Sequence, residues 1–163
     1  MATRIREYRS SDEEPVIEFA LRAWAPVFAS LEEALGAELF ALLHHGDGDW
    51  RRYQENAIRR TLVDPSMHTW VADASPEPLG FVSARLTGDR QIGEIFMLAV
   101  DPDRQDHGIG TALTDVATCW LRDSGARVAF VETGGDPGHA PARRVYEKAA
   151  YNVLPIARYF KAL

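Results

Sequence analysis

The clearest chemical signal in this sequence is a pair of glycines at the start of a predicted helix, Gly108 and Gly110. Glycine has no Cβ, so the backbone at these positions can approach a ligand closely. The first N–H groups of a helix have no intrahelical partner and, with the positive end of the helix dipole, they favour an anion. The alternative for such a pair is a tight loop with no ligand. We predict a phosphate-binding loop formed by Gln105, Asp106, His107, Gly108, Ile109, Gly110 and Thr111.

The residues after this loop favour a helix and exclude two other nucleotide-binding motifs. Apolar side chains recur at three- and four-residue spacing from Ile109 to Leu121, and Asp123-Ser124-Gly125 marks the end. A dinucleotide-binding fingerprint needs a third glycine where Leu113 stands, and a P-loop needs a Lys-Ser or Lys-Thr pair that is missing. The loop therefore suits a diphosphate bound by a different class of protein.

A second motif follows the predicted strand from Val128 to Thr133. A loop of turn residues, Gly134 to Gly138, leads to a short predicted helix from His139 to Tyr151, with Pro141 in its first turn. Tyr146 lies on the apolar face of this helix, where a core aromatic is the ordinary interpretation.

With these two motifs in order, the chain resembles the GNAT superfamily of acyl-coenzyme A dependent N-acetyltransferases. Gln105 to Gly110 is similar to the family's Arg/Gln-x-x-Gly-x-Gly/Ala diphosphate loop. Ala142 to Lys148 is similar to the helix that carries the family's thiolate-facing tyrosine. The resemblance spans about residues 79 to 160.

The resemblance implies acetyl-coenzyme A as co-substrate and a role for each motif. The glycine loop would bind the diphosphate, a bulged and splayed strand would pair with the pantetheine arm, and Tyr146 would protonate or solvate the departing thiolate. Backbone N–H groups near Leu98 would stabilise the oxyanion. Beyond the loop, the implied cofactor-binding residues are Leu98, Ala99, Val100, His139, Ala142 and Tyr146.

Two positions depart from the family pattern. His139 stands where the family often has Asn, and it can still hydrogen-bond the pantetheine arm. Ala150 stands where the family commonly has Gly, and it lacks the freedom of glycine at a helix end. These departures motivate one alternative function, a catalytically inactive domain that binds or senses coenzyme A.

The reaction implied by the resemblance needs a base, because an amine near neutral pH is mostly an ammonium without a lone pair. Glu94 is the first candidate, since it begins the strand whose far end leads to the diphosphate loop. Histone-acetylating members of the family carry a catalytic glutamate at the same distance from their glycine loop. The other interpretation of Glu94 is a solvated carboxylate at a strand end. Glu132 on the next predicted strand is the reserve candidate, and water is the third.

The composition is that of a small acidic protein. The 163 residues are 46% hydrophobic and carry a net charge of -6, which fits one domain, argues against a nucleic-acid-binding surface and weakly favours a cationic partner. The single cysteine, Cys119, cannot form an internal disulfide. No apolar run approaches the length of a membrane span. We therefore expect a cytoplasmic protein that binds neither nucleic acid nor membrane.

The stretch His44-His45-Gly46-Asp47-Gly48-Asp49 does not indicate a metal site. Adjacent histidines point apart on a helix, and no cysteine accompanies them. We interpret this stretch as a loop near the acceptor entrance and predict no metal ligand.

The order of the predicted elements favours a mixed α/β fold. A strand at 4–9 precedes helices at about 13–24, 31–44 and 50–62, and strands follow at 67–72, 79–86 and 92–100. After the glycine-initiated helix come a strand at 128–133, a helix at 139–151 and a last strand at 151–160. With the resemblance, residues 1–163 are expected to form one GNAT-like domain. Its central sheet would be mostly antiparallel, with about six to seven strands, a splayed parallel pair and helices on both faces.

These observations predict an N-acetyltransferase that moves an acetyl group from acetyl-coenzyme A to a primary amine by direct attack in a ternary complex. The acceptor would be a small molecule, aminoglycoside, polyamine, amino acid or protein amine. Transfer of another acyl group is the alternative within enzymes. A homodimer is a candidate assembly.

Overall fold

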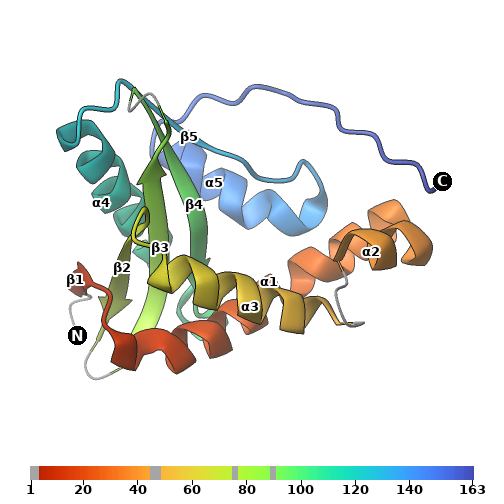
Figure 1. Cartoon of the computed structure of the whole chain (residues 1–163), viewed down its shortest axis with the longest axis horizontal. Helices are drawn as coiled ribbons and strands as arrows, with labels where there is room; N and C mark the ends of the chain where they lie inside the picture. Colours follow the sequence, from red (N-terminus) through yellow and green to blue (C-terminus); the bar gives the residue numbers. More distant parts are fainter. Residues whose placement is uncertain (1–3, 45–48, 75–76, 89–90) are drawn as a thin grey trace.

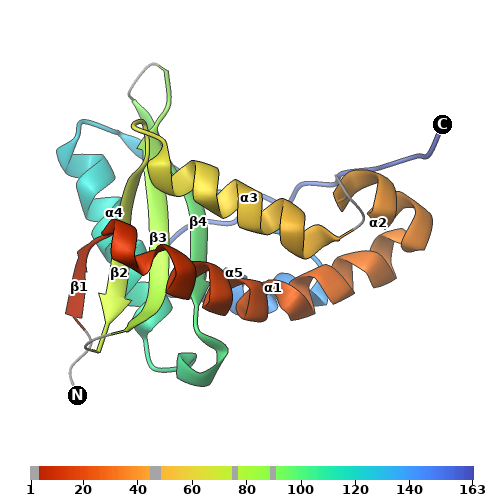
Figure 2. The ribbon, with the colours of Figure 1, turned by 60° about the horizontal axis from the view of Figure 1, so that its bottom comes forward.

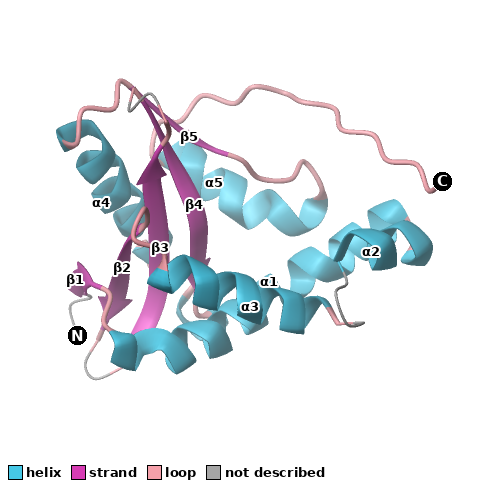
Figure 3. Cartoon of the chain, in the orientation of Figure 1, coloured by secondary structure: helices cyan, strands magenta, loops and turns pink. Residues whose placement is uncertain are grey.

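The computed structural model describes residues 4–44, 49–74, 77–88 and 91–163. Its strands are β1 (Arg4–Glu7), β2 (His68–Asp73), β3 (Pro78–Leu86), β4 (Ile92–Val100) and β5 (Val128–Val131). Its α-helices are α1 (Glu13–Leu35), α2 (Ala37–His44), α3 (Trp50–Val63), α4 (Ile109–Asp123) and α5 (Ala140–Lys148). Short 3-10 helices are η1 (Ser10–Asp12), η2 (Pro102–Arg104) and η3 (Pro137–His139). Figures 1 and 3 show this arrangement.

The sheet has the strand order β1-β2-β3-β4-β5. The pairs from β1 to β4 are antiparallel, and β5 joins β4 in parallel after the crossover through α4. The prediction of a mixed, mostly antiparallel sheet with one parallel pair is therefore confirmed.

The predicted number of strands is wrong, because the described residues form a sheet of five strands rather than six or seven. The predicted last strand at 151–160 is a loop that leaves the sheet and runs away from it (Figure 3). Pro155 removes one backbone donor from this segment, and its apolar side chains face solvent, with Leu154 at 76% and Tyr159 at 91% exposure. The alternation of apolar residues predicted a strand. A strand also needs a neighbouring strand to pair with, and residues 151–160 pair with none of the described strands.

Helices cover both faces of the sheet, as predicted (Figure 2). On one face α4 packs its apolar stripe, including Leu113, Ala117 and Leu121, against Ile95 of β4 and its neighbours. On the other face α1 and α3 lie side by side and bury Phe19 and Ile58 against Phe81 of β3. Burial on both faces holds β3 and β4 in fixed positions beneath the site.

The helix boundaries near the start of the chain differ from the prediction. The first helix continues through Pro26 to Leu35, well beyond the predicted end near Trp24, and the chain breaks instead at Gly36, where φ is 78°. Glycine adopts this left-handed conformation at little cost, so it ends a helix more effectively than the lone proline does. The long α1 then reaches from the sheet to the loop before α5.

The strand β4 is bulged and then left open on one side. Ser83 pairs with Met97 and Ala84 pairs with Ile95, so Phe96 has no partner on β3. The parallel pairing with β5 ends where Ile95 meets Val131. From Phe96 to Val100, β4 therefore has a free edge, as expected for a splayed parallel pair.

Candidate functional site

The loop before α4 has the backbone geometry of an anion-binding site. Gly108 is the N-cap of α4 with φ of 78°, and Asp106 also has a positive φ of 62°. The first described hydrogen bond of the helix backbone runs from the N–H of Ala112 to the carbonyl of Gly108. Within the described part of the chain, no hydrogen bond uses the N–H groups of residues 106–111. Successive free donors at a helix start form a concave site for a phosphate group.

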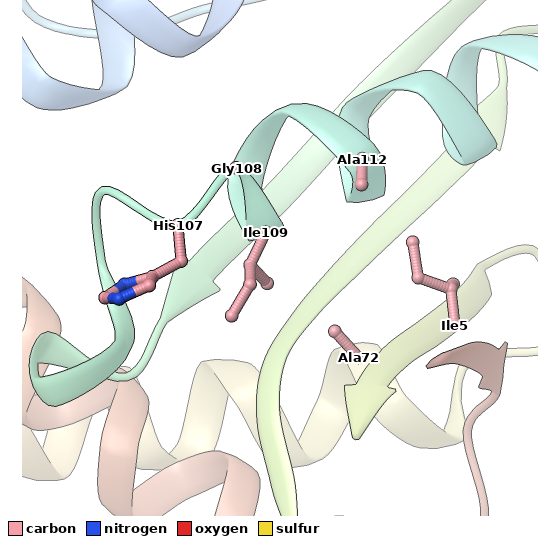
Figure 4. Close-up of a pocket in the computed structure, with 6 residues that line it drawn as sticks. All are labelled: Ile5, Ala72, His107, Gly108, Ile109 and Ala112. Atoms are coloured by element: carbon pink, nitrogen blue, oxygen red, sulfur yellow. The ribbon is translucent and has the colours of Figure 1, made fainter. Parts of the chain in front are cut away.

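A small pocket lies beside this loop, between α4 and the edge of the sheet (Figure 4). Its volume is about 80 Å³, and it is lined by Ile5, Ala72, His107, Gly108, Ile109 and Ala112. Pockets for whole small-molecule ligands occupy roughly 300–1,000 Å³, so this one holds at most a small fragment. Its apolar lining distinguishes it from the polar face that the loop presents to an anion.

The free edge of β4 presents the backbone of Leu98 and Val100. The N–H of Asp101 bonds the carbonyl of Leu79 at 2.8 Å, so by the alternation of an antiparallel ladder odd-numbered residues face β3 and even-numbered residues face the free edge. The carbonyl of Leu98 accepts the indole N–H of Trp24 at 3.3 Å, and that of Val100 accepts the side-chain amide of Gln105 at 3.2 Å. The N–H groups of Leu98 and Val100 remain available to a ligand carbonyl.

The structure thus brings two of the three predicted strand residues to the open edge. The backbone of Ala99 faces β3, and its side chain is buried at 5% exposure against α1. Trp24 of α1 lies against the same edge through its bond to the carbonyl of Leu98.

Tyr146 has a buried ring and an accessible oxygen. Its side chain is 9% exposed, and burial, with a smaller contribution from Tyr151, raises the pKa of its phenol above the ordinary value. No described hydrogen bond uses its hydroxyl, and no buried side-chain oxygen or nitrogen among the described residues lacks a partner. The hydroxyl of Tyr146 therefore reaches solvent, and it stays protonated near neutral pH.

Contacts with α4 fix the helix that carries Tyr146. The hydroxyl of Tyr151 lies 2.7 Å from the Thr118 hydroxyl, and a Cβ placed on Gly110 would lie 3.2 Å from Val145. The chain turns away from the helix at Ala150, where φ is 62° and the N–H of the next residue bonds the carbonyl of Tyr146 at 3.0 Å. Alanine thus adopts a left-handed turn that glycine forms more easily.

Arginines hold both carboxylates that the sequence offered as a base. Glu94 accepts Arg85 Nε at 2.7 Å, and the Arg85 guanidinium lies 4.6 Å from the ring centre of Phe96. Glu132 is ion-paired with Arg158. Each of these carboxylates therefore already accepts a hydrogen bond from a cation.

A further polar cluster, which sequence reasoning missed, lies in the loop before α5. Asp136 accepts the Ser30 hydroxyl at 2.6 Å and the Nδ1–H of His139 at 2.5 Å, and the Gly138 N–H donates to both Asp136 and Ser30. Arg143 caps the carbonyls of Gly134 and Asp136. An Asp-Pro-Gly turn followed by His was visible in the sequence, but its partner on α1 was not.

Other predicted features lie away from this region. Ala142 is half-buried on α5 without a described polar contact, and residues 45–48 of the histidine stretch lie outside the described residues. Among the described residues, no group of three or more His, Cys, Asp or Glu side chains could hold a metal ion. None of the described helices has the length and apolar character that crossing a membrane requires.

Comparison with protein families gives one clear match. The model of the "Acetyltransferase (GNAT) family" matches residues 28–151, which include β4, the glycine loop and α5. A curated relative, "Mycothiol acetyltransferase" of Arthrobacter sp. (strain FB24), is 30% identical over 139 residues. That alignment covers 81% of this chain but only 42% of the relative. A second relative of the same name, from Beutenbergia cavernae, is 33% identical over 125 residues, covering 76% of this chain and 41% of its own length. The chain thus spans less than half the length of these relatives.

Solved structures share the fold. The PaiA N-acetyltransferase of Thermoplasma acidophilum in complex with coenzyme A superposes with a TM-score of 0.65 at 18% identity, covering 91% of this chain and 89% of that one. An aminoglycoside acetyltransferase from an uncultured soil metagenomic sample, in complex with sisomicin, superposes with a TM-score of 0.58 at 15% identity, covering 99% and 96%. At these identities the likeness concerns the fold alone.

Proposed function

Because the chain belongs to the acetyltransferase (GNAT) family, as its two motifs predicted, we propose that it transfers an acetyl group from acetyl-coenzyme A to a primary amine of a small molecule. The observation that carries this proposal is the free edge of β4 ending in the open backbone donors of the loop at 105–111. A diphosphate carries negative charge, and a pantetheine arm carries amide groups. The two neighbouring surfaces suit these two chemistries.

The residues present fit coenzyme A in their donor chemistry. The N–H groups from Asp106 to Thr111 would hold the diphosphate, and a side chain at Gly108 would face open space, so a ligand can approach there. The N–H groups of Leu98 and Val100 would bind amide or thioester carbonyls of the arm. His139 and Ala142 remain predicted contacts of the arm at the start of α5.

The chemistry of transfer needs an oxyanion site and a proton donor. The N–H of Leu98 would stabilise negative charge on the thioester oxygen, because a donor fixed in a strand needs no reorganisation. Tyr146 would give its proton to the departing sulfur, and its buried ring and accessible hydroxyl support that role. Glu94 remains a proposed base only if its ion pair with Arg85 opens.

The acceptor is proposed to be a small cationic amine. The net charge of -6 favours a positively charged partner. Some relatives carry the name mycothiol acetyltransferase, and one neighbour in fold binds sisomicin, so small acceptors are the first to test. An inactive coenzyme A sensor is the second candidate, and its motive weakens because Ala150 forms the glycine-like turn.

Calorimetry with acetyl-coenzyme A, followed by thioester turnover with sisomicin, spermidine and lysine, tests the proposal. Gly108→Asp and Gly108→Asn form a matched pair, because both side chains tolerate a positive φ and only the first is charged. We expect Gly108→Asp to lose at least about tenfold more affinity than Gly108→Asn, since each factor of ten is about 1.4 kcal/mol. Equal affinities would contradict the loop assignment. Tight binding without turnover of any acceptor would favour a sensor.

A further inference from the structure

The proposed reaction needs a group that accepts a proton from the acceptor ammonium. Both carboxylates suggested by the sequence are bound by guanidinium groups, Glu94 by Arg85 and Glu132 by Arg158. An acceptor ammonium would have to compete with these guanidinium groups for either carboxylate. His139 offers a proton acceptor without a cationic partner among the described hydrogen bonds and ion pairs.

His139 is held in the orientation of a base. Its Nδ1 lies 2.5 Å from Asp136 Oδ1, and a carboxylate can only accept, so Nδ1 carries the hydrogen. In the neutral ring this leaves the lone pair on Nε2. Burial alone would raise the pKa of Asp136, but the hydrogen bonds from Ser30 and His139 outweigh it and hold the pKa below its ordinary value. Asp136 is therefore a charged carboxylate behind the ring near neutral pH.

The second ring nitrogen is free and accessible. No described hydrogen bond uses His139 Nε2, and no buried side-chain nitrogen or oxygen among the described residues lacks a partner. Nε2 must therefore reach solvent, although the side chain as a whole is only 19% exposed. A buried carboxylate, a fixed imidazole and an exposed lone pair form a directed proton acceptor.

Two helices connect His139 to the other parts of the site. On α1, Trp24 contacts the carbonyl of Leu98 and Ser30 contacts Asp136, and six helical residues span about 9 Å. On α5, Tyr146 follows His139 by seven residues, about two helical turns or roughly 10 Å. Along these two helices, the contact with the free edge of β4, the phenol of Tyr146 and the imidazole are thus separated by steps of no more than about two helical turns.

We propose that His139 takes the first proton from the acceptor ammonium through Nε2, with Asp136 as the positioning residue behind it. This inference rests on the proposed function. The proton moves from nitrogen to Nε2, the amine lone pair forms the C–N bond, and the C–S bond breaks. The second nitrogen proton replaces the one that Tyr146 gives to sulfur. The imidazolium then returns its proton to solvent.

The surroundings of His139 contain few other charges. In its own loop the facing group is Asp136, and from α5 it is Arg143, whose guanidinium bonds the carbonyls of Gly134 and Asp136. From α1 the loop meets Ser30, Pro26 and Val27. No charged side chain of α1 has a described hydrogen bond or ion pair with this loop. Among the described residues, the charged group in contact with the His139 ring is therefore Asp136.

A measurement without any acceptor tests the arrangement itself. Long-range proton–nitrogen NMR of the full chain with acetyl-coenzyme A absent and present reports the tautomer of each histidine, and His139→Gln identifies the signal. We expect the neutral ring of His139 to carry its hydrogen on Nδ1, towards Asp136. An Nε2–H tautomer would overturn the inference even if turnover is confirmed.

Turnover against pH tests the role, using the acceptor found active among sisomicin, spermidine and lysine. For His139→Gln we expect kcat/KM to fall by about 10²- to 10⁴-fold at neutral pH, the loss shrinking as pH rises and the amine deprotonates by itself. Acetyl-coenzyme A is kept saturating for each variant, because His139 is also a predicted contact of the pantetheine arm. If kcat/KM of His139→Gln falls by the same factor at all pH values, the inference is overturned. It is also overturned if Glu94→Gln, and not His139→Gln, loses the acid limb of the pH profile.

His68→Gln is the matched control. His68 also faces a carboxylate, Glu7 at 3.2 Å, but it packs on Trp70 and Trp120 at the α4 face. Its variant should keep the pH profile of the wild type. If His139→Gln fails to fold, Ser30→Ala removes one hydrogen bond of Asp136 and should shift the acid limb of the profile. If the acid limb of the Ser30→Ala profile is unshifted, Asp136 does not act as the positioning residue.

Discussion

Asp12 and Asp136 each accept hydrogen bonds from three donor atoms, and they stand near opposite ends of α1. Asp12 accepts two guanidinium nitrogens of Arg6 at 2.7 and 2.9 Å and the N–H of Arg9 at 2.8 Å. Asp136 accepts Ser30 at 2.6 Å, His139 at 2.5 Å and the N–H of Gly138 at 3.1 Å. As acceptors, the two carboxylates are nearly alike.

The two clusters differ in their partners. Arg6 also bonds Asp73 at 2.5 Å and cannot lose its proton, so its cluster is closed and ties β1 to β2 and η1. His139 can change its charge, and its second nitrogen reaches solvent. A buried aspartate is therefore structural or chemical according to whether its partner titrates and remains accessible.

The largest effect on stability should come from breaking the closed cluster. Asp12→Ala leaves Arg6 without its main partner in a buried place, and we expect a loss of about 3 kcal/mol in the free energy of unfolding. Urea denaturation measures this, and turnover at a temperature where the variant is folded should stay near that of the wild type. Surface substitutions change the free energy of unfolding by up to about 0.5 kcal/mol. A loss smaller than this would mean that Asp73 alone is enough to hold Arg6.

The cluster of Asp136 and His139, called the open cluster because His139 reaches solvent, should respond in the opposite way. In Gly134→Ala, activity should fall and stability should not. The new Cβ would collide with Asp136 Oδ1 and His139 Nδ1, so it separates this pair without removing either group. Misplacing a catalytic group by about 1 Å can lower the rate by up to ~10²-fold. We expect kcat/KM to fall by up to this factor, while the free energy of unfolding changes little. Gly135→Ala is the control, because nothing lies within 4 Å of its added Cβ. Equal rates in the two variants would contradict the prediction.

Acid should affect the closed cluster through Asp12. Burial raises the pKa of Asp12, but the hydrogen bonds from Arg6 and Arg9 outweigh it and lower the pKa below its ordinary value. A depressed folded pKa means that the contribution is complete above the unfolded pKa and is lost as pH falls through the folded one. Stability below about pH 4 should fall more steeply in the wild type than in Asp12→Ala. Parallel curves would contradict this.

The smallest effect is expected at the end of α5, the helix that joins the open cluster to Tyr146. Ala150→Gly relieves a left-handed alanine, and we expect a gain of roughly 0.5–1 kcal/mol in stability with unchanged turnover. Thermal unfolding detects such a gain. A loss of stability would show that the Cβ of Ala150 contributes packing that outweighs the strain.

Much of the fold could be predicted from local patterns. The helix from Ile109 to Asp123 has its predicted limits, because its apolar spacing and its flanking glycines act within one element. The strand from Ile92 to Val100 was predicted for the same reason. The segment at 151–160 was predicted wrongly, since alternation cannot show whether a pairing edge is within reach.

The candidate site was predictable where a motif is local, and hidden where its partners are distant. The order of the residues from Gln105 to Gly110 was enough to indicate free helix-start donors. Whether Glu94 is free could not be predicted, because its state depends on Arg85 across the β3–β4 pair.

The sequence by itself determined the elements and the anion loop, since hydrophobic spacing and glycine conformation act between near neighbours. Only the tertiary structure decided which titratable groups are ion-paired, as Glu94 is, and which have an accessible nitrogen, as His139 has. Ser30 and Asp136 are 106 residues apart in the chain, and α1 brings them together by packing across the sheet. Such contacts depend on the whole core, because the free energy that holds them comes from burial elsewhere in the molecule.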